Sequence, residues 1–557
     1  MTTHHIRPET PTSPARLSSR DAAAETTWRA GADQWHGRST LGQAFAAGVA
    51  ENPADTLVFA STARPDSLTL AELGARGALV ARALHSLGLR RGDVLAAQMP
   101  QWSEQLTLWY AASQLGLVYL PIIHIYGPVE LSYILADSGA RALIVPDTWR
   151  SIDYLQRVAE LGDLPALDNI VVVGDAGTSG CLQWEDLVGR AAREANGTPV
   201  RPDPDVSTTD ACLLLYTSGT TALPKGVVHT SDSFLAEAWT SFPVLYRGPR
   251  SVTLDVSPAG HMASIIGVTR PILTHANLTI FMDAWSAEHA LDLVSRYHVT
   301  SSGGPPYFLS TLLDAAGDNP GRLGGITDWM LGGSAVPVPL SQRAEEIGLR
   351  TYRCYGSTEH PTVSTNMPTD TEDQRTRTDG KPLPGTHVRI VDEDERDLPL
   401  GEEGEIRVVG PEQMAGYTDP EATAQAFDSR GYFRTGDLGV LRPDGHLQVT
   451  GRKKDIIIRG GENLSALEIE EILLRHPAVR EVAAVAVPDQ VYTERVCAVV
   501  SLEAGTALSL EDVRRHFVQS GVAKHKTPER LVVMAELPHT ATGKVKKQEL
   551  REKFRSS

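Results

Sequence analysis

The sequence has little cysteine, no long apolar run and fewer basic than acidic residues, and each shortage excludes a class of protein. Four cysteines occur in 557 residues, with no CxxC pair and no histidine cluster at zinc-ligand spacing. A disulfide framework and a structural zinc site are therefore excluded, and the cysteines are interpreted as reduced structural residues. No run of about 18 apolar residues occurs, and the N-terminal segment carries charges and prolines where a signal peptide needs an apolar core. We expect a cytoplasmic protein without a membrane span.

The charge balance also limits the partners. The chain has 52 Lys and Arg against 69 Asp and Glu, which argues against binding to nucleic acid or to an anionic membrane. Residues 1–450 carry 34 basic against 54 acidic side chains, whereas residues 451–557 carry 18 against 15. This contrast predicts a separate, basic C-terminal domain beside an acidic body. A small anionic ligand in a local basic site is compatible with it, and both a monomer and a homodimer stay open.

Length and hydrophobic pattern predict a large N-terminal α/β domain. A prior of roughly 100–200 residues per domain predicts several domains or subdomains. Residues 1–30 are rich in Thr, Pro, Ser and Arg and are expected to be a disordered lead-in. Over residues 31–451, apolar β-type runs alternate with helical patterns, one of which begins at the capping-box residues Thr69 and Glu72. This alternation predicts stacked, parallel-rich β-sheets with covering helices.

The pattern changes near Gly451, and residues 452–557 predict a small α+β domain. A basic cluster and a short apolar run, GRKKDIIIRGG, precede a helix pattern in which Ser465 and Glu468 have capping-box spacing. Two further β-type runs, EVAAVAVP and RLVVMAEL, flank another helix pattern. The expected unit has about 100 residues, the size of an independent domain.

Residues 216–226, YTSGTTALPKG, form a loop rich in hydroxyls and glycine that follows the apolar run ACLLL. A Walker A loop requires GxxxxGK[ST], and Pro224 together with Gly226 excludes that motif. The loop still suits phosphate, because hydroxyls donate, glycine lets backbone N–H groups approach, and lysine supplies charge. Taken alone, it fits a polar surface turn at least as well. The candidate phosphate ligands are Thr217, Ser218, Gly219, Thr220, Thr221 and Lys225.

Five further motifs follow the loop, and each combines glycine with a few polar or charged side chains. They are GGSAVP at 332–337, YGSTEHPTVS at 355–364, YFRTGDLG at 432–439, GRKKDIIIRGGEN at 451–463 and TATGKVKKQEL at 540–550.

Together the six motifs resemble those of the adenylate-forming superfamily, which includes acyl-CoA synthetases, peptide-synthetase adenylation domains and luciferases. The loop is similar to the superfamily signature [YF]TSG[ST]TGxPKG. The other five, in chain order, resemble its adenine-binding turn, its YGxTE motif, its ribose-binding motif, its interdomain hinge and its catalytic-lysine motif. The resemblance covers residues from about 40 to 557. Within the superfamily, PIIHIYGPVELSYIL looks most like FadD-like ligases for medium-chain, alicyclic or aromatic acids.

The resemblance implies a reaction that uses ATP, Mg²⁺ and a small-molecule carboxylic acid, with CoA as the second substrate. The acid attacks the α-phosphate, pyrophosphate leaves, and the thiol of CoA attacks the acyl-adenylate. Lys544 would bridge the acid carboxylate and the α-phosphate. Thr358 would donate to the α-phosphate, and Glu359 would hold Mg²⁺ as an oxygen ligand. The other implied nucleotide contacts are Lys225 at the β- and γ-phosphates, Gly332, Gly333, Ser334, Tyr355 and Gly356 at the adenine, and Asp437 and Arg452 at the ribose.

The resemblance also implies an acid pocket and a mobile C-terminal domain. Lys454 would be the hinge about which this domain rotates after adenylation, withdrawing the catalytic lysine. Gly460 and Gly461 would then border a tunnel for the pantetheine arm, where a side chain would obstruct the thiol. The implied acid-pocket residues are His261, Gly303, Gly304 and Pro305.

Two departures and several alternatives stay open. Ala222 replaces a glycine that is usual in the loop, which puts its mobility in doubt, and His124 in PIIHIYG has no role that the sequence reveals. An alternative to a CoA ligase is an AMP-forming ligase of specialised metabolism that uses a carrier protein as acceptor, or that activates another acid such as nitrite for diazotisation of an aryl amine. A nonenzymatic binding protein on the same scaffold is disfavoured, because it would be expected to lose Lys544, Glu359 or Asp437.

Overall fold

The computed structural model describes most of the chain, with gaps that include the N-terminus and the phosphate loop. The lead-in expected over residues 1–30 lies outside the described residues. Within the described part, no helix is both long and apolar enough to cross a membrane. The described ranges are 35–124, 126–194, 202–217, 224–242, 251–274, 276–459, 462–489, 492–520, 524–540 and 543–555.

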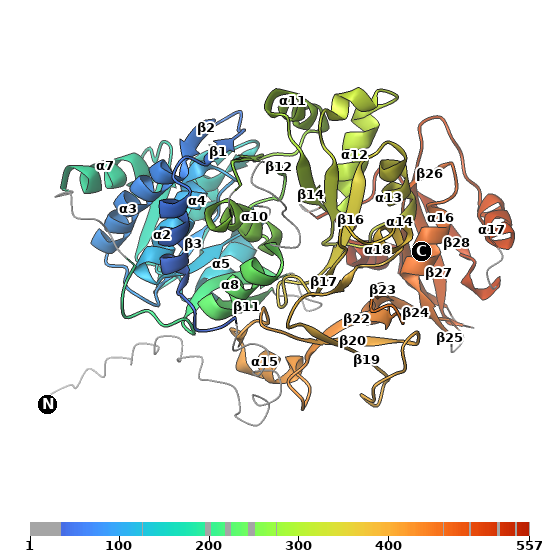
Figure 1. The fold of residues 1–557 in the computed structure, drawn as a ribbon. Coiled ribbons are helices and arrows are strands. Elements are labelled where there is room, and N and C mark those ends of the chain that lie inside the picture. The colour runs from blue at the N-terminus through green and yellow to red at the C-terminus, as the bar shows by residue number, and fades with distance from the viewer. Residues whose placement is uncertain are drawn as a thin grey trace, which may run out of the picture.

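The first layer of the N-terminal region is an eight-stranded sheet (Figure 1). Its strands are parallel from β10 to β9, while β11 and β21 add an antiparallel edge. Short runs of Val, Leu and Ala form these strands, since both faces are covered and every position is buried in several of them. In sheet order the strands are β21 (Gly416–Tyr417), β11 (Lys225–Thr230), β10 (Ala211–Thr217), β4 (Val118–Pro121), β3 (Val94–Ala97), β5 (Ala142–Pro146), β8 (Asn169–Val173) and β9 (Leu182–Gln183).

A nine-stranded sheet forms the second layer. Its central strands are parallel, and antiparallel strands close both edges. In sheet order they are β18 (Lys381–Pro382), β17 (Ser364–Thr365), β16 (Arg350–Tyr355), β15 (Asp328–Leu331), β14 (Ser301–Gly304), β12 (Val252–Asp255), β13 (Leu278–Phe281), β1 (Thr56–Phe59) and β2 (Asp66–Thr69).

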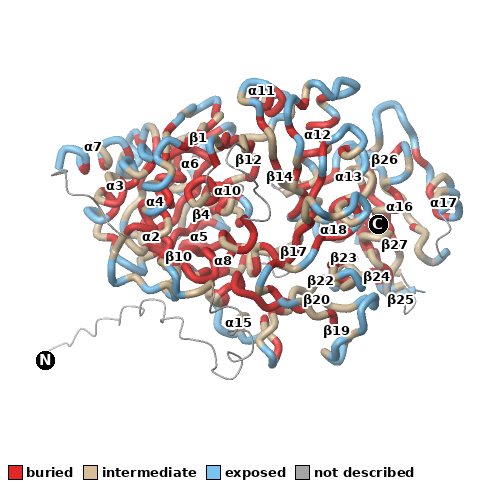
Figure 2. The backbone as a smooth tube through the Cα atoms, viewed as in Figure 1, coloured by how far each residue is buried: buried red, intermediate tan, exposed pale blue. Residues whose placement is uncertain are grey.

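Helices cover these two sheets, and Figure 2 shows buried segments in the interior and exposed segments on the outer helices and loops. The predicted capping box forms, because Thr69 and Glu72 exchange side-chain and backbone hydrogen bonds at the start of α3. The covering helices are α2 (Leu41–Glu51), α3 (Leu70–Ser86), α4 (Ser103–Leu115), α5 (Pro128–Ser138), α6 (Tyr154–Ala159), α7 (Trp184–Glu194), α8 (Ser231–Thr240), α10 (Met262–Leu273), α11 (Ala287–Tyr297), α12 (Pro306–Ala316), α13 (Val338–Glu346), α14 (Glu372–Arg377) and α15 (Pro420–Ala426).

Two smaller sheets complete the fold. An antiparallel four-stranded sheet precedes the C-terminal domain, whose five-stranded sheet packs with three helices (Figure 1). The first consists of β19 (His387–Val391), β20 (Glu403–Val409), β22 (Phe433–Leu441) and β23 (Leu447–Arg452); the second consists of β24 (Ile456–Arg459), β25 (Glu462–Ser465), β26 (Val479–Asp489), β27 (Thr493–Leu502) and β28 (Arg530–Val533), with α16 (Ala466–Leu473), α17 (Leu510–Gln519) and α18 (Lys547–Phe554). The remaining short elements are β6 (Thr148–Trp149), β7 (Ile152–Asp153) and the 3₁₀ turns Pro320–Leu323, Lys453–Asp455 and Lys524–Lys526.

The predicted fold class is confirmed, since a large N-terminal region of stacked sheets precedes a smaller α+β domain. One detail of the prediction is wrong: the capping box at α16 is only half formed. Ser465 Oγ accepts from the Glu468 N–H at 3.3 Å, but the Glu468 carboxylate contacts Lys526 Nζ at 2.7 Å instead of returning to the cap. An ion pair with a residue distant in sequence has replaced the local contact.

Candidate active site

The predicted phosphate loop is bounded by two paired strands. β10 ends at Thr217 and β11 begins at Lys225, and these residues are register partners in an antiparallel pair. Both are partly buried. The strand pairing therefore holds the two ends of the loop opposite each other. The other loop residues, Ser218, Gly219, Thr220, Thr221 and Ala222, lie outside the described residues.

Tyr417 connects Lys225 to Glu359. The Tyr417 hydroxyl donates to Glu359 Oε1 at 2.8 Å, and the Lys225 ammonium lies 5.2 Å from the centroid of the Tyr417 ring. Burial raises the pKa of Tyr417, and the neighbouring carboxylate raises it further, so the phenol stays protonated as a donor. Tyr417 is absent from the sequence prediction, because a lone tyrosine in a two-residue strand carries no motif.

The turn that carries Thr358 and Glu359 is tight. A Cβ on Gly356 would lie 1.9 Å from the Pro361 carbonyl oxygen, so a side chain cannot fit there. The Ser357 N–H donates to the His360 carbonyl at 2.9 Å, and the Glu359 carbonyl accepts from the backbone N–H of the segment before β21 at 2.8 Å. The backbone is thus held on both sides while both predicted side chains remain partly exposed.

Asp437 lies between a tyrosine and an arginine. Its side chain is 5 % exposed; Oδ2 accepts a 2.8 Å hydrogen bond from the Tyr355 hydroxyl, and Oδ1 lies 2.8 Å from Arg452 Nε. Asp437 and Arg452 are register partners on β22 and β23, which explains their contact. Burial raises the pKa of Asp437, although Arg452 and the Tyr355 hydroxyl act in the opposite direction. The predicted ribose pair and the predicted adenine tyrosine are therefore in direct contact.

The residues of the predicted adenine turn and acid pocket lie at the carboxyl ends of neighbouring strands, and so at the same edge of the nine-stranded sheet. β14, β15 and β16 are parallel neighbours, and Gly304 on β14 is the register partner of Leu331 on β15. In open α/β sheets, ligands bind outside the carboxyl ends of such strands. A Cβ on Gly332 would lie 2.4 Å from Cys354 Sγ, so this position needs glycine. The predicted residues at this edge are Gly303, Gly304, Pro305, Gly332, Gly333, Ser334, Tyr355 and Gly356.

Lys544 approaches this edge from the C-terminal domain. Burial among protein atoms lowers its pKa to about 8; Arg452 also lowers the pKa, while Asp437 and Glu359 oppose the change. Part of the side chain stays accessible to solvent, but the protein atoms around it displace water, and this is the main reason that its pKa is lowered. The preceding Gly543 packs against α12, since a Cβ on it would lie 2.8 Å from Tyr307 Cβ. The fold thus brings Lys544 close to residues that precede it by 92 to 185 positions in the sequence.

His261 and His124 lie together near Lys544. Burial lowers the pKa of His261 to about 3, and Lys544 and His124 lower it further; burial lowers that of His124 to about 4. The Nε2 atom of His261 is buried without a hydrogen-bond partner. A Cβ on Gly260 would lie 2.7 Å from the Ile123 backbone N, which places the segment before His124 against the start of α10. His124, unexplained in the sequence, thus lies beside the predicted acid pocket.

The predicted hinge follows β23 directly. Lys454 is exposed in the short 3₁₀ turn Lys453–Asp455. Protein atoms around its ammonium displace water and lower its pKa, and the charge of Arg452 lowers the pKa as well, whereas Asp455 acts in the opposite direction. Gly460 and Gly461, predicted to border the pantetheine tunnel, lie outside the described residues. The hinge and tunnel therefore stay predictions.

No group of three or more potential metal ligands from His, Cys, Asp and Glu occurs among the residues that the structure describes. Glu359 is the carboxylate at the predicted metal position, and its Oε1 already accepts from Tyr417. Mg²⁺ is commonly held by one or two carboxylates together with substrate phosphates and water. A single oxygen ligand beside a phosphate lysine fits that pattern.

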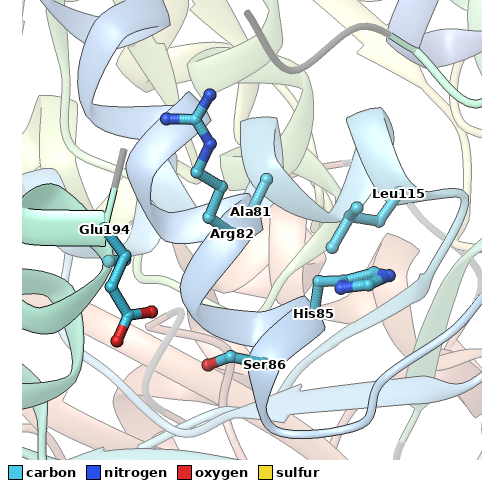
Figure 3. Close-up of a pocket in the computed structure, with 7 residues that line it drawn as sticks. Ala81, Arg82, His85, Ser86, Leu115 and Glu194 are labelled. Carbon is cyan, nitrogen blue, oxygen red and sulfur yellow. The ribbon is translucent and has the colours of Figure 1, made fainter. Parts of the chain in front are cut away.

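One cavity among the described residues lies away from this site. It has a volume of about 390 Å³ and is lined by residues of α3, α4 and α7, including His85 and Glu194 (Figure 3). No predicted site residue lines it. The convergence of Lys544, Asp437 and Glu359 marks the site instead, because these side chains belong to the motifs and the residues that line the cavity do not.

The chain matches the sequence models of two protein families. The sequence model of the AMP-binding enzyme family matches residues 45–418, and that of the AMP-binding enzyme C-terminal domain matches residues 468–544. The chain is 32 % identical over 493 residues to a medium-chain fatty-acid–CoA ligase of Escherichia coli strain K12, covering 87 % of this chain and 85 % of that one.

Two further proteins extend the comparison. A salicyl-AMP ligase/salicyl-S-ArCP synthetase of Mycobacterium tuberculosis is 32 % identical over 493 residues, covering 86 % of this chain and 84 % of that one. The solved structure of an anthranilate CoA ligase in complex with anthranoyl-AMP superposes with a TM-score of 0.82 at 25 % identity, covering 94 % of this chain and 99 % of that chain. The chain therefore belongs to the AMP-binding enzyme family and carries its C-terminal domain as well.

Proposed function

We propose that the protein activates a carboxylic acid with ATP and transfers the acyl group to CoA. The observation that carries the proposal is the convergence of Lys544 with Asp437, Arg452 and Glu359. Attack of a carboxylate on a phosphate brings two anions together, and a cation at that point offsets their repulsion. The similarity to enzymes named as CoA ligases supports the same conclusion.

In the first half-reaction, a carboxylate oxygen forms a bond to the α-phosphorus, and the bond from that phosphorus to the β-phosphate oxygen breaks. Lys544 would contact the carboxylate and the α-phosphate, and Thr358 would donate to the α-phosphate. Lys225 and the loop that it ends would hold the departing pyrophosphate. These cations and donors act where charge accumulates, which is the main catalytic requirement of phosphoryl transfer.

Residues of β22 and β23 would hold the ribose, and the turn after β15 would hold the adenine. Asp437 has two acceptor oxygens suited to the ribose hydroxyls, and its pairing with Arg452 and Tyr355 fixes its orientation. The glycines after β15 would let the adenine approach the backbone closely, and Gly332 cannot take a side chain because a Cβ there would lie 2.4 Å from Cys354 Sγ. Mg²⁺, held by Glu359 and the phosphates, would neutralise charge on the leaving group.

In the second half-reaction, the CoA thiol adds to the acyl carbonyl carbon of the adenylate, and AMP leaves with the electron pair of the broken anhydride bond. We propose a boundary between residues 31–451 and 452–557, with rotation about Lys454 between the two steps. The rotation would withdraw Lys544 and bring Gly460 and Gly461 to the pantetheine arm.

The acid would enter beside His261, His124 and the Gly303–Gly304–Pro305 segment. The buried, unpaired Nε2 of His261 gives this region a polar atom that an acid with a hydrogen-bonding substituent could satisfy. A second candidate acceptor is a carrier protein, because one relative is named as a salicyl-S-ArCP synthetase.

ATP–pyrophosphate exchange across a panel of fatty, alicyclic and aromatic acids tests the proposal. The preferred acid should stimulate exchange, and with CoA present pyrophosphate release should match thiol consumption. Pyrophosphate release without thiol loss would exclude CoA and favour the carrier protein. The absence of exchange with every acid in the panel would count against acid activation itself.

A further inference from the structure

β11 carries a second polar side chain on the face that bears Lys225. Side chains on one face of a strand recur every second residue, so Lys225, Val227 and His229 share a face. Across the strand pair, Val227 is the register partner of Tyr417, the tyrosine that bonds Glu359. The strand that begins at the phosphate lysine therefore passes directly beneath the Thr358–Glu359 turn.

His229 is completely buried and makes two hydrogen bonds. Its Nε2 lies 2.7 Å from the Thr358 carbonyl oxygen, and its Nδ1 lies 3.1 Å from Ser233 Oγ. A carbonyl oxygen only accepts, so Nε2 carries the hydrogen, and Nδ1 is left to accept from the Ser233 hydroxyl. Burial lowers the pKa of His229 to about 4, against the opposing contact with the Thr358 carbonyl, so the ring is neutral near pH 7.

The contact fixes more than one carbonyl. The Thr358 carbonyl and the Glu359 N–H belong to one planar peptide, so holding the oxygen fixes the orientation of the peptide that joins the two predicted ligands. Glu359 is then held by its own carbonyl and by Tyr417. His229 supplies the contact to this peptide from a strand that ends at the phosphate loop.

We propose that His229, near the end of β11, is a positioning residue that orients the Thr358–Glu359 peptide. The orientation would direct this peptide toward the metal-bound phosphates, which Lys225 would bind at the start of the same strand. This inference rests on the proposed function for the identity of the metal and the nucleotide. It does not depend on which acid or acceptor the enzyme uses. The contact makes the turn and the phosphate lysine move as one unit.

Two substitutions of similar size separate a donor from simple packing. In His229→Gln, the side-chain amide N–H can reach the place of Nε2, whereas His229→Leu fills the space without a donor. Val228→Ala is the control for packing, because Val228 is buried on the opposite face of the same strand. The readout is ATP affinity measured by calorimetry with Mg²⁺ and again with EDTA, together with the melting temperature.

We expect His229→Leu to lose about 10- to 100-fold of the affinity for MgATP, the scale of one buried hydrogen bond. Its affinity for ATP in EDTA and its thioester formation from a supplied acyl-adenylate should change little. His229→Gln should recover most of the affinity for MgATP that His229→Leu loses. Val228→Ala should lower the melting temperature without changing the increase in ATP affinity that Mg²⁺ produces. The wild type should bind MgATP whether or not any tested acid supports exchange, so a wrong substrate assignment leaves this comparison intact.

Any of the following results would overturn the inference. One is an equal loss of ATP affinity in His229→Leu with and without Mg²⁺. Another is a loss of both half-reactions by the same factor, which would assign His229 a structural role alone. Others are wild-type affinity for MgATP in His229→Leu and, in the wild type itself, no binding of MgATP, which would also contradict the proposed function.

Discussion

Replacing Lys544 with alanine should separate the two half-reactions. The Lys544 ammonium is exposed to solvent but surrounded by Arg452, Asp437 and Glu359, which places it at the nucleotide end of the site. If adenylation uses this cation and thioester formation does not, only the first step should suffer. Lys546→Ala is the matched control, because Lys546 lies two residues away and contacts Glu549 at 3.7 Å instead.

The size of the effect follows from one charge near a phosphate. At a separation of about 4 Å and an effective dielectric constant of about 20, the attraction is about 4 kcal/mol, or nearly a factor of 10³. Exposure of Lys544 to water reduces this figure, and Lys225 and Arg452 stay in place. We therefore expect kcat for adenylation to fall about 10²- to 10³-fold, within the range for loss of one electrostatic contact.

The pH profile supplies an independent signature. A lysine is active here as the cation, so its contribution is present below its pKa and is lost as the pH rises through it. With the Lys544 pKa lowered to about 8, adenylation by the wild type should decline above that pH, or somewhat higher once the phosphates are bound. Lys544→Ala should lack this decline.

The assays are ATP–pyrophosphate exchange for the first step and thiol consumption with a supplied acyl-adenylate for the second. A role of Lys544 in adenylation alone is excluded if Lys544→Ala slows both steps by the same factor, or if Lys546→Ala slows adenylation as much as Lys544→Ala does. Unchanged melting temperatures would confirm that both variants fold.

Three further changes test the nucleotide contact, the docking of the C-terminal domain and the pH dependence of stability. Asp437→Asn should weaken ATP binding about 10- to 100-fold by calorimetry, because it removes the charge of a buried acceptor; unchanged affinity would remove Asp437 from the nucleotide site. Gly543→Ala should slow adenylation but spare thioester formation from a supplied adenylate, because Gly543 has a φ of 75° and a Cβ would meet Tyr307; equal slowing of both steps would argue against this docking. Glu412 is completely buried and accepts hydrogen bonds from the Thr240 and Thr386 hydroxyls, and burial raises its pKa to about 8. Its protonation in the folded state therefore stabilises the fold fully below the ordinary carboxyl pKa, and this stabilisation is lost as the pH rises through about 8. Glu412→Gln should therefore show a smaller fall in unfolding free energy from pH 5 to 8 in urea titrations, and identical slopes would contradict the raised pKa.

Local signals in the sequence predict the parts of the site that lie within one segment. The capping box at Thr69 forms because its contacts span three residues, and the glycines at 332 and 356 are needed because neighbouring backbone or sulfur leaves no room for a Cβ. The box at Ser465 forms only in part, because Glu468 finds Lys526 in space. The ion pair with Lys526, 58 residues away in the sequence, has replaced the local contact of the Glu468 carboxylate.

Local signals in the sequence predict the large α/β region and the α+β C-terminal domain, because hydrophobic period is a local property of the chain. The residue types expected around a nucleotide follow from the resemblance of six short motifs, each of which also lies within one segment. The tertiary structure alone decided that Tyr417 bonds Glu359, that His229 holds the Thr358 carbonyl, and that His124 lies beside His261. These contacts join segments on different strands and loops. Their partners are chosen by sheet register and domain packing, which no single stretch of sequence encodes.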